Sequence, residues 1–426
     1  MAFHGKGRTP FGVPEIDRIE ASWKPAGVGI DVHKGMLFAC ILLPDYVHNT
    51  VQRHTQKFPT SQEGLTLLGH WLRHTLPADF RQFVIESTST YHFPVVLALT
   101  DFTPIIINPM LVGAAKRKAD KWDAASLAYH CLTGVWPPQL LPTSEEFELR
   151  LLLRRRRKIL ASTTQITNSL GSRLTAYGVT ISRLFPMKSK LGLDLVTALV
   201  QRRPLVSFAR TEEESRELEA LQPLAYMVPT RIRNMLDRMV QDVVALEEEK
   251  AFVEKEALDL AAMVHQEKGI DFLGLLKTVP GIGPICGLTF LAEVGFHPAR
   301  RFATCRKAVA YCGFDPTKRY SADKVTSHLT RSGNKHVRVA FIQAAQGVLT
   351  RPGELAAWGR SVGGRNKGNA YNTAVLAVAR RLCRACYYVL NLQQPFDPSH
   401  WNYHAQAEQL DRELRQIGRA SCRERV

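Results

Sequence analysis

The sequence predicts a mixed α/β sheet at the N-terminal end of the chain and an almost wholly helical remainder. Two observations lead to this fold class. Between residues 27 and 107, short apolar runs separated by turn residues alternate with runs that have helical spacing. From residue 144 onward, apolar residues recur every three or four positions over two very long stretches. A β-meander followed by alternating helices and strands is typical of a sheet that helices cover.

The elements of the predicted α/β domain, residues 27–140, follow one another in a regular order. Residues 1–26 precede it and mix Gly, Pro and charged residues without periodicity, which indicates a flexible basic arm. Three strands come first, with a turn at His33-Lys34-Gly35: Val28–Val32, Met36–Leu43 and Val51–Phe58. Helices and strands then alternate: helix Gln62–Thr75, strand Gln82–Ile85, helix Phe93–Leu99, strand Pro104–Ile107, and helices Pro109–Lys116 and Trp122–Leu132.

Two long helices are predicted in the next domain, residues 141–268. Glu145–Tyr177 and Thr230–His265 carry apolar residues at mixed three- and four-residue spacing, which favours an antiparallel coiled coil. Between them, residues 181–221 are predicted to be an irregular insertion, because Pro186 and Pro204 interrupt the pattern.

The C-terminal part of the chain is expected to be a third, mostly helical domain, residues 269–402, followed by a tail, residues 403–416. The last segment, 417–426, reads IGRASCRERV and resembles the translation of a sequencing adapter. We expect this segment not to belong to the natural protein.

The charge of the chain favours a polyanionic partner. The formal net charge is +17 and the sequence pI is about 9.7, and each Lys or Arg placed on a phosphate releases condensed counterions. The eight cysteines form no disulfide framework, so we expect a reducing compartment. Cys383 and Cys386 form a CxxC inside a helical run, which favours buried thiols over a zinc site. We find no long apolar run and no signal peptide, and therefore expect a soluble intracellular protein.

Two features of the helical part point to nucleic acid. The run Arg154–Lys158 is the densest positive patch, although a solvated helix face explains it equally well. The Pro280–Gly283 turn resembles a helix-hairpin-helix element, whose backbone N–H groups suit a phosphate. The predicted nucleic-acid contacts are Arg154, Arg155, Arg156, Arg157, Lys158, Gly281, Gly283, Lys318, Arg319, Arg331, Asn334, Lys335 and Arg338.

Four acids are the candidate metal ligands. Asp31 and Glu86 each follow an apolar strand, where they lie at the carboxyl edge of a sheet. Asp120 and Asp123 are three residues apart at a helix start and share one face. Such a cluster repels itself unless cations bind it, and two Mg²⁺ ions would serve phosphoryl transfer. Each acid alone also fits an ordinary turn or helix-start residue, so only the set is informative.

The order of motifs along the chain resembles one family, the DEDD transposases of insertion-sequence family 110, which are related to the Piv and MooV DNA invertases. The resemblance covers about Gly27 to Asn402. Its motifs are GIDVHK at Gly29–Lys34, IEST-x-x-Y at Ile85–Tyr91, INP at Ile107–Pro109, K-x-D-x-x-D-A-x-x-LA at Lys118–Ala128, PGIG at Pro280–Gly283, RF-x-x-x-RK-x-x-AYCGFDP at Arg301–Pro316, RSGN at Arg331–Asn334 and PFDPSHWN at Pro395–Asn402.

The resemblance implies an RNase H-like (RuvC-like) domain, a coiled-coil domain and a C-terminal transposase domain. It also implies that Asp31, Glu86, Asp120 and Asp123 hold Mg²⁺ and that Ser321 is the nucleophile. Composition alone places Ser321 in a polar, basic loop, Lys318–Lys324, with no special role. Family members recombine donor and target DNA through a covalent phosphoserine, under the direction of a bridge RNA. They assemble as homo-oligomers, so a dimer or tetramer in the bacterial cytoplasm, at the nucleoid, is expected.

The chain departs from the family pattern at some of these motifs. Ser87-Thr88-Ser89 stands where Ala-Thr-Gly is usual, and Ala322 follows the serine in place of Gly.

The leading hypothesis is therefore a metal-dependent, serine-using DNA recombinase. Two alternatives stay open at this point. One is a metal-only endonuclease resembling a junction resolvase, in which water attacks the phosphate. The other is a non-catalytic nucleic-acid-binding protein whose acids no longer bind metal.

Overall fold

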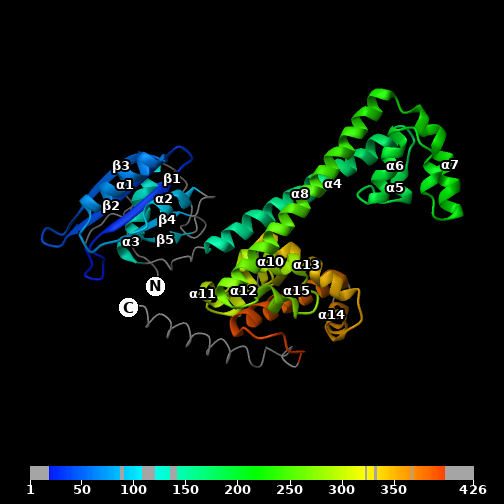
Figure 1. The fold of residues 1–426 in the computed structure, drawn as a ribbon. Coiled ribbons are helices and arrows are strands. Elements are labelled where there is room, and N and C mark those ends of the chain that lie inside the picture. The colour runs from blue at the N-terminus through cyan, green and yellow to red at the C-terminus, as the bar shows by residue number, and fades with distance from the viewer. Residues whose placement is uncertain are drawn as a thin grey trace. The chain divides into compact units, whose positions relative to one another are not determined.

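The computed structural model describes residues 19–86, 91–107, 120–134, 142–321, 324–330, 333–365 and 368–398. For residues 120–123, 316–321 and 324–330 it describes the backbone alone. The chain divides into two compact units, residues 1–141 and 142–426, and Figure 1 labels their helices and strands. The predicted helix Pro109–Lys116, the residue Arg331, the tail and the last ten residues lie outside the described ranges.

The first unit contains a five-stranded sheet with the strand order β3-β2-β1-β4-β5. Its strands are β1 (Gly27–Val32), β2 (Met36–Asp45), β3 (Thr50–Pro59), β4 (Gln82–Glu86) and β5 (Thr103–Ile107), and its helices are α1 (Gln62–Thr75), α2 (His92–Ala98) and α3 (Asp120–Thr133). The first three strands form an antiparallel meander, and β4 and β5 run parallel to β1. Each of these elements begins and ends within two residues of its predicted position. The predicted mixed α/β sheet is confirmed.

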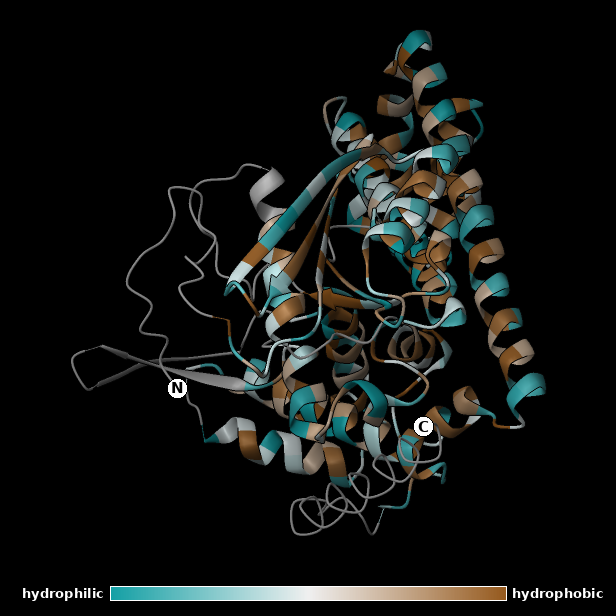
Figure 2. Cartoon of the chain, turned by 90° about the vertical axis from the view of Figure 1, so that its left-hand side faces the viewer, coloured by the Kyte–Doolittle hydropathy of each residue, from teal (hydrophilic) through white to brown (hydrophobic). Residues whose placement is uncertain are grey.

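The two faces of the sheet have separate cores because side chains alternate along a strand. Val28 and Ile30 of β1 belong to one cluster together with the buried stripe Leu65, Leu68 and Leu72 of α1. Phe38, Cys40 and Leu42 of β2 belong to a second cluster together with Ala124, Ala128 and Leu132 of α3. The edge strand β3 carries mainly exposed polar side chains. Figure 2 colours the ribbon by hydropathy and shows hydrophilic and hydrophobic residues alternating along the described elements.

The second unit is built on two long antiparallel helices, α4 (Ser144–Thr175) and α8 (Thr230–Lys268). Thr143 and Glu146 start α4 with a reciprocal capping box, and Gly269 ends α8 in the left-handed conformation at φ 67°. Lys268 pairs with Glu145 at one end of the helix pair. Arg155 pairs with Glu249 further along, which fixes the antiparallel direction. The predicted antiparallel pairing is confirmed.

The prediction that residues 181–221 are irregular is wrong. The segment contains α5 (Ile181–Leu184), α6 (Lys190–Val200), the 3-10 helix η2 (Leu205–Phe208) and the start of α7 (Glu212–Met227). Pro186 and Pro204 lie between these helices, so they separate elements and do not prevent them. The side chains of Ser189 and Thr211 cap α6 and α7. The apolar residues of these helices form a core of their own with α4 and α8, including Leu174, Leu195, Leu199, Leu218 and Leu236.

The rest of the second unit is a helical core that carries one β-hairpin. Its elements are α9 (Phe272–Lys277), α10 (Pro284–Val294), α11 (Pro298–Arg301), α12 (Cys305–Tyr311), β6 (Pro316–Ser321), β7 (Lys324–Thr330), α13 (Lys335–Leu349), α14 (Glu354–Gly364) and α15 (Ala370–Leu392). The predicted loop Lys318–Lys324 is wrong in its secondary structure, because β6 and β7 pair as antiparallel strands over most of it. Residues 316–321 gain backbone hydrogen-bond partners from 324–330, which local sequence does not reveal.

The prediction for the two cysteines of the CxxC is confirmed. Cys383 and Cys386 of α15 are fully buried free thiols, as predicted. Burial raises the pKa of Cys386, which keeps this thiol protonated. Along the described helices we find none whose length and apolar character suit a membrane crossing.

Candidate carboxylate site and serine hairpin

Asp31 and Glu86 end two neighbouring parallel strands. The register pairs Ile30 of β1 with Ile85 of β4, so the next residues, Asp31 and Glu86, lie side by side. Residues in register on neighbouring strands point to the same face of the sheet. Asp31 is only 6% exposed, and its carboxylate Oδ2 lies 3.2 Å from Nε2 of His33 in the following turn. Two acids therefore share one edge of the sheet.

Helix α3 packs on β1 through two glycines that allow a very close approach. A Cβ at Gly29 would lie 2.2 Å from the backbone oxygen of Ala124, and one at Gly27 would lie 2.3 Å from that of Ala128. Because the contacts run backwards along the helix as they run forwards along the strand, α3 is antiparallel to β1. The N-terminal turn of α3 consequently lies at the carboxyl end of β1.

This packing brings Asp120 to the level of Asp31. Asp120 precedes Ala124 by one helical turn, about 6 Å along the helix. Asp31 follows Gly29 by two strand residues, about 6.6 Å in the same direction. Gly27, Gly29 and Asp31 alternate along β1, so the side chain of Asp31 points to the face that α3 covers. The backbones of three acid-bearing elements thus converge at one place.

The chemistry of this donor set fits a hard divalent cation. Mg²⁺ prefers carboxylate oxygens, and a buried carboxylate such as Asp31 is costly without a compensating positive charge. The side chains of Asp120 and Asp123 lie outside the description. Among the described side chains, no three residues of metal-binding type form a cluster. The metal assignment of all four acids stays a prediction.

Ser321 is the last residue of β6 and pairs with Lys324 at the tip of the hairpin. The base of the hairpin is tightly closed. A Cβ at Gly333 would lie 2.4 Å from the backbone nitrogen of Gly313, and the backbone N–H of Asn334 donates to the carbonyl of Tyr311 at 2.7 Å. The residues that flank the hairpin are therefore packed closely against the helical core.

A buried carboxylate, that of Glu293 at the end of α10, binds residues next to the base of the hairpin. It is 2% exposed and accepts hydrogen bonds from Arg154 at 3.0 and 3.1 Å and from Asn334 at 2.7 Å. Arg150 lies 3.3 Å away. Burial acts to raise the pKa of Glu293, but the hydrogen bonds and charges of the arginines outweigh it, so the pKa is lowered. This network joins α4, α10 and α13 beside the base of the hairpin.

The side chain of Asn334 makes hydrogen bonds to other groups of the protein. It is the N-cap of α13, and its Oδ1 accepts from the backbone N–H groups of His336 and Val337. Its Nδ2 donates to Glu293 and to the hydroxyl of Tyr311. A second residue of the predicted set, Arg338, donates to the carbonyl of Gly313 and lies over the ring of Phe314. Both residues have structural roles that the sequence motif did not reveal.

The predicted glycine turn joins α9 and α10. Gly281 has φ 87°, a left-handed conformation that suits glycine. A Cβ there would lie 2.4 Å from the side chain of Val348, so the turn packs on α13. Gly283 precedes α10 as its N-cap and has open space around it. Lys318 and Arg319 lie in β6, where only the backbone is described.

His33, Arg150 and Glu293 belong to these networks but are not among the residues predicted from the sequence. His33 lies two residues after Asp31 in the GIDVHK motif, and this closeness in the sequence is the signal that predicts their contact. Glu293 and Arg150 are 143 residues apart, and no local pattern links them.

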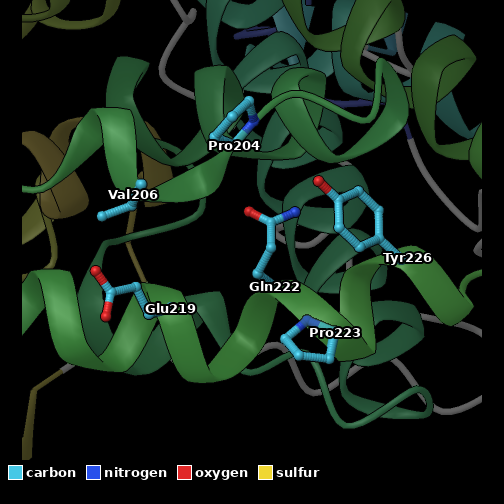
Figure 3. A pocket seen from close by; sticks show the side chains of 6 residues that line it. All are labelled: Pro204, Val206, Glu219, Gln222, Pro223 and Tyr226. Carbon is cyan, nitrogen blue, oxygen red and sulfur yellow. The ribbon is translucent and has the colours of Figure 1, made fainter.

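A pocket of about 410 Å³ is lined by residues of η2 and α7 and by Pro204, which precedes η2 (Figure 3). Its lining residues are Pro204, Val206, Glu219, Gln222, Pro223 and Tyr226. Gln222 closes one side by accepting from the backbone N–H of Leu205 at 2.6 Å. None of the predicted site residues lines it.

Comparisons with known proteins match two regions of the chain. Residues 28–179, which include the four acids, match the family model of the IS110 DEDD transposases. Residues 273–357, which include Ser321 and the network around Glu293, match the model of the transposase IS116/IS110/IS902 family. The pocket segment lies outside both matches.

Curated relatives give the same result at low identity. The chain is 21% identical to the insertion element IS116 protein of Streptomyces clavuligerus, over 62% of this chain and 67% of that protein. It is 23% identical to the pilin gene-inverting proteins of Moraxella bovis and Moraxella lacunata, over 87% of this chain and 97% of each relative. On these matches, the chain belongs to the IS116/IS110/IS902 family of transposases, and it is a DNA transposase or recombinase.

Proposed function

We propose that the chain cuts and rejoins DNA with Mg²⁺ held by Asp31, Glu86, Asp120 and Asp123, and with Ser321 as the nucleophile. The first unit is then an RNase H-like (RuvC-like) catalytic domain. The packing of α3 on Gly27 and Gly29 is the observation that carries the proposal, because it brings the first turn of α3 to the edge where Asp31 and Glu86 end.

The proposed reaction conserves the energy of the phosphodiester. The hydroxyl of Ser321 loses its proton and forms a bond to phosphorus, while one bridging DNA oxygen leaves and takes up a proton. A DNA hydroxyl then attacks the phosphoserine and releases the serine. Two Mg²⁺ ions would stabilise the charge on the attacking and leaving oxygens. In this scheme the four acids would bind the Mg²⁺ ions and so orient the phosphate, and Ser321 forms the covalent link to the DNA.

The central test compares Ser321→Ala with the wild-type chain on a DNA substrate of the element. A covalent protein–DNA adduct is expected with wild type and is expected to be absent with Ser321→Ala, as measured on denaturing gels. An adduct that survives the substitution overturns the role of Ser321. Full cleavage without any adduct supports the metal-only endonuclease instead.

The carboxylates need a separate test. Asp120→Asn is expected to lower the rate at least about a hundredfold, because a catalytic cation supplies several kcal/mol of transition-state stabilisation. Mg²⁺ binding, measured by titration calorimetry, is expected to weaken in the same variant. Equal and absent binding in both proteins would favour the non-catalytic alternative.

Guidance and assembly belong to the same proposal. The family resemblance supports a structured bridge RNA that selects donor and target DNA, and a homo-oligomeric enzyme. Sequencing of RNA that co-purifies with the chain tests the guide, and light scattering tests the oligomer. Because two relatives are named for inverting a pilin gene, inversion of a DNA segment is a reaction to assay beside transposition.

A further inference from the structure

The five basic residues at 154–158 differ in their partners. Arg154 is held by Glu293, and Arg155 makes two hydrogen bonds to Glu249 at 2.5 and 2.7 Å. Arg156 lies 2.5 Å from Glu254. These three guanidinium groups are therefore neutralised within the protein, and they fix α4 against α8 and α10. A polyanion would have to compete with a carboxylate at each of them.

Arg157 and Lys158 have no carboxylate partner among the described side chains. Arg157 instead reaches α13, where its Nη1 donates to the carbonyl of Lys335 at 3.1 Å and lies 3.3 Å from Nδ1 of His336. Lys158 is exposed on the same helix, α4. Arg157 and the first residues of α13 thus meet although they are 178 residues apart in the chain.

Lys335 adds a third positive charge at the same place. It is the exposed first residue of α13, and no described carboxylate pairs with it. The N-terminus of a 15-residue helix also carries partial positive charge. Arg157, Lys158 and Lys335, called the basic patch below, are therefore three cations without a neutralising acid in the described part of the chain. Phosphates are the anions that such a patch fits best.

We propose that the basic patch binds the backbone of the duplex DNA on which Ser321 acts. This inference rests on the proposed function, because the patch lies at the base of the serine hairpin. Helix α13 begins soon after β7, and the pairing of Pro316 with Thr330 marks the base of the hairpin. From Pro316 to Ser321 the strand advances about 16 Å. A duplex that follows the hairpin rises by that length in about five base pairs, so the patch holds phosphates about five base pairs from the scissile one.

The test measures duplex affinity as a function of salt for the full chain. Each lost phosphate contact lowers the slope of log K against log salt by about 0.9. Arg157→Gln/Lys158→Gln is expected to lower the slope by about 2, and Lys335→Gln by about 1. Arg155→Gln/Arg156→Gln removes the same charge from the same helix and is expected to leave the slope near that of wild type. Melting temperatures of all variants verify folding.

Three outcomes would overturn the inference. If Arg157→Gln/Lys158→Gln and Arg155→Gln/Arg156→Gln have equal salt slopes, pairing with a carboxylate does not decide which of these residues contact phosphates. A slope that changes for a structured RNA but not for duplex DNA assigns the patch to RNA. Ethylation interference maps the phosphates whose modification prevents binding. If none of them lies four to six base pairs from the cut, the predicted spacing is wrong.

Failure of the inference is distinguishable from failure of the proposed function. If wild type forms the adduct that depends on Ser321 but the two double variants have equal slopes, the inference fails and the proposed function stands. If the adduct is absent in wild type as well, the proposed function fails, whatever the salt slopes show.

Discussion

Asp31 and Glu293 are both buried acids, at 6% and 2% exposure, but their surroundings are opposite. Glu293 lies among arginines and an amide donor, and its charge is matched inside the protein. Oδ2 of Asp31 lies 3.2 Å from Nε2 of His33, and Asp31 follows Ile30, which is in register with the residue before Glu86. Glu293 thus joins helices through arginines of its own chain, whereas the proposed Mg²⁺ would supply the positive charge beside the buried Asp31.

The largest effect is expected from removing Glu293. Glu293→Ala leaves Arg150 and Arg154 without their buried partner, and breaking a buried pair costs about 3–5 kcal/mol. Urea denaturation of the full chain measures this loss in the transition of the second unit. Glu249→Ala serves as the control, because it removes only a surface partner of Arg155 and is expected to cost much less stability than Glu293→Ala. Equal losses for the two variants would show that Glu293 does not join the helices.

A smaller effect is expected at the glycine contact of the first unit. Gly29→Ala forces α3 away from β1, since the new Cβ would lie 2.2 Å from the oxygen of Ala124. Overpacking of this kind costs about 1–3 kcal/mol. It is also expected to weaken Mg²⁺ binding, because the first turn of α3 moves relative to Asp31. Gly35→Ala, which has nothing within 4 Å, is the matched control. Calorimetry that finds the same Mg²⁺ affinity for both variants contradicts the role of α3.

The smallest expected effect is a pH dependence of stability that differs between the two units. Burial lowers the pKa of His130 on α3 from 6.5 to about 4. Between pH 6.5 and 4 the unfolded chain binds a proton that the folded first unit does not, so stability falls as pH falls. We expect a loss of about 1–2 kcal/mol, allowing for the partial exposure of His130. Glu293 has a lowered pKa and therefore loses its contribution only at lower pH, below about 4.5.

The pH prediction is checked by thermal unfolding of wild type and His130→Gln at pH 7, 6 and 5. Glutamine stays neutral, so the variant is expected to show the smaller change over this range. Parallel curves for the two proteins would assign the acid sensitivity to other groups.

The positions of the strands, and the sheet edge at which Asp31 and Glu86 lie, followed from the sequence. Apolar alternation and turn residues are local signals, and they placed β1, β4 and α3 within two residues. An acid directly after a buried strand lies at the edge of the sheet whatever packs on it, so Asp31 and Glu86 were assigned to one edge correctly. The same local signals failed for residues 181–221, because Pro186 and Pro204 separate helices there and do not mark irregular structure.

The sequence by itself determined the order of elements, the family motifs and the excess of positive charge. Only the tertiary structure decided which charges remain available. The acids that neutralise Arg154, Arg155 and Arg156 lie 139, 94 and 98 residues away in the chain. The lysine that joins Arg157 lies 178 residues away. Periodicity describes neighbours along one helix, whereas an ion pair depends on two helices meeting, so five similar residues acquired different roles only when the chain folded.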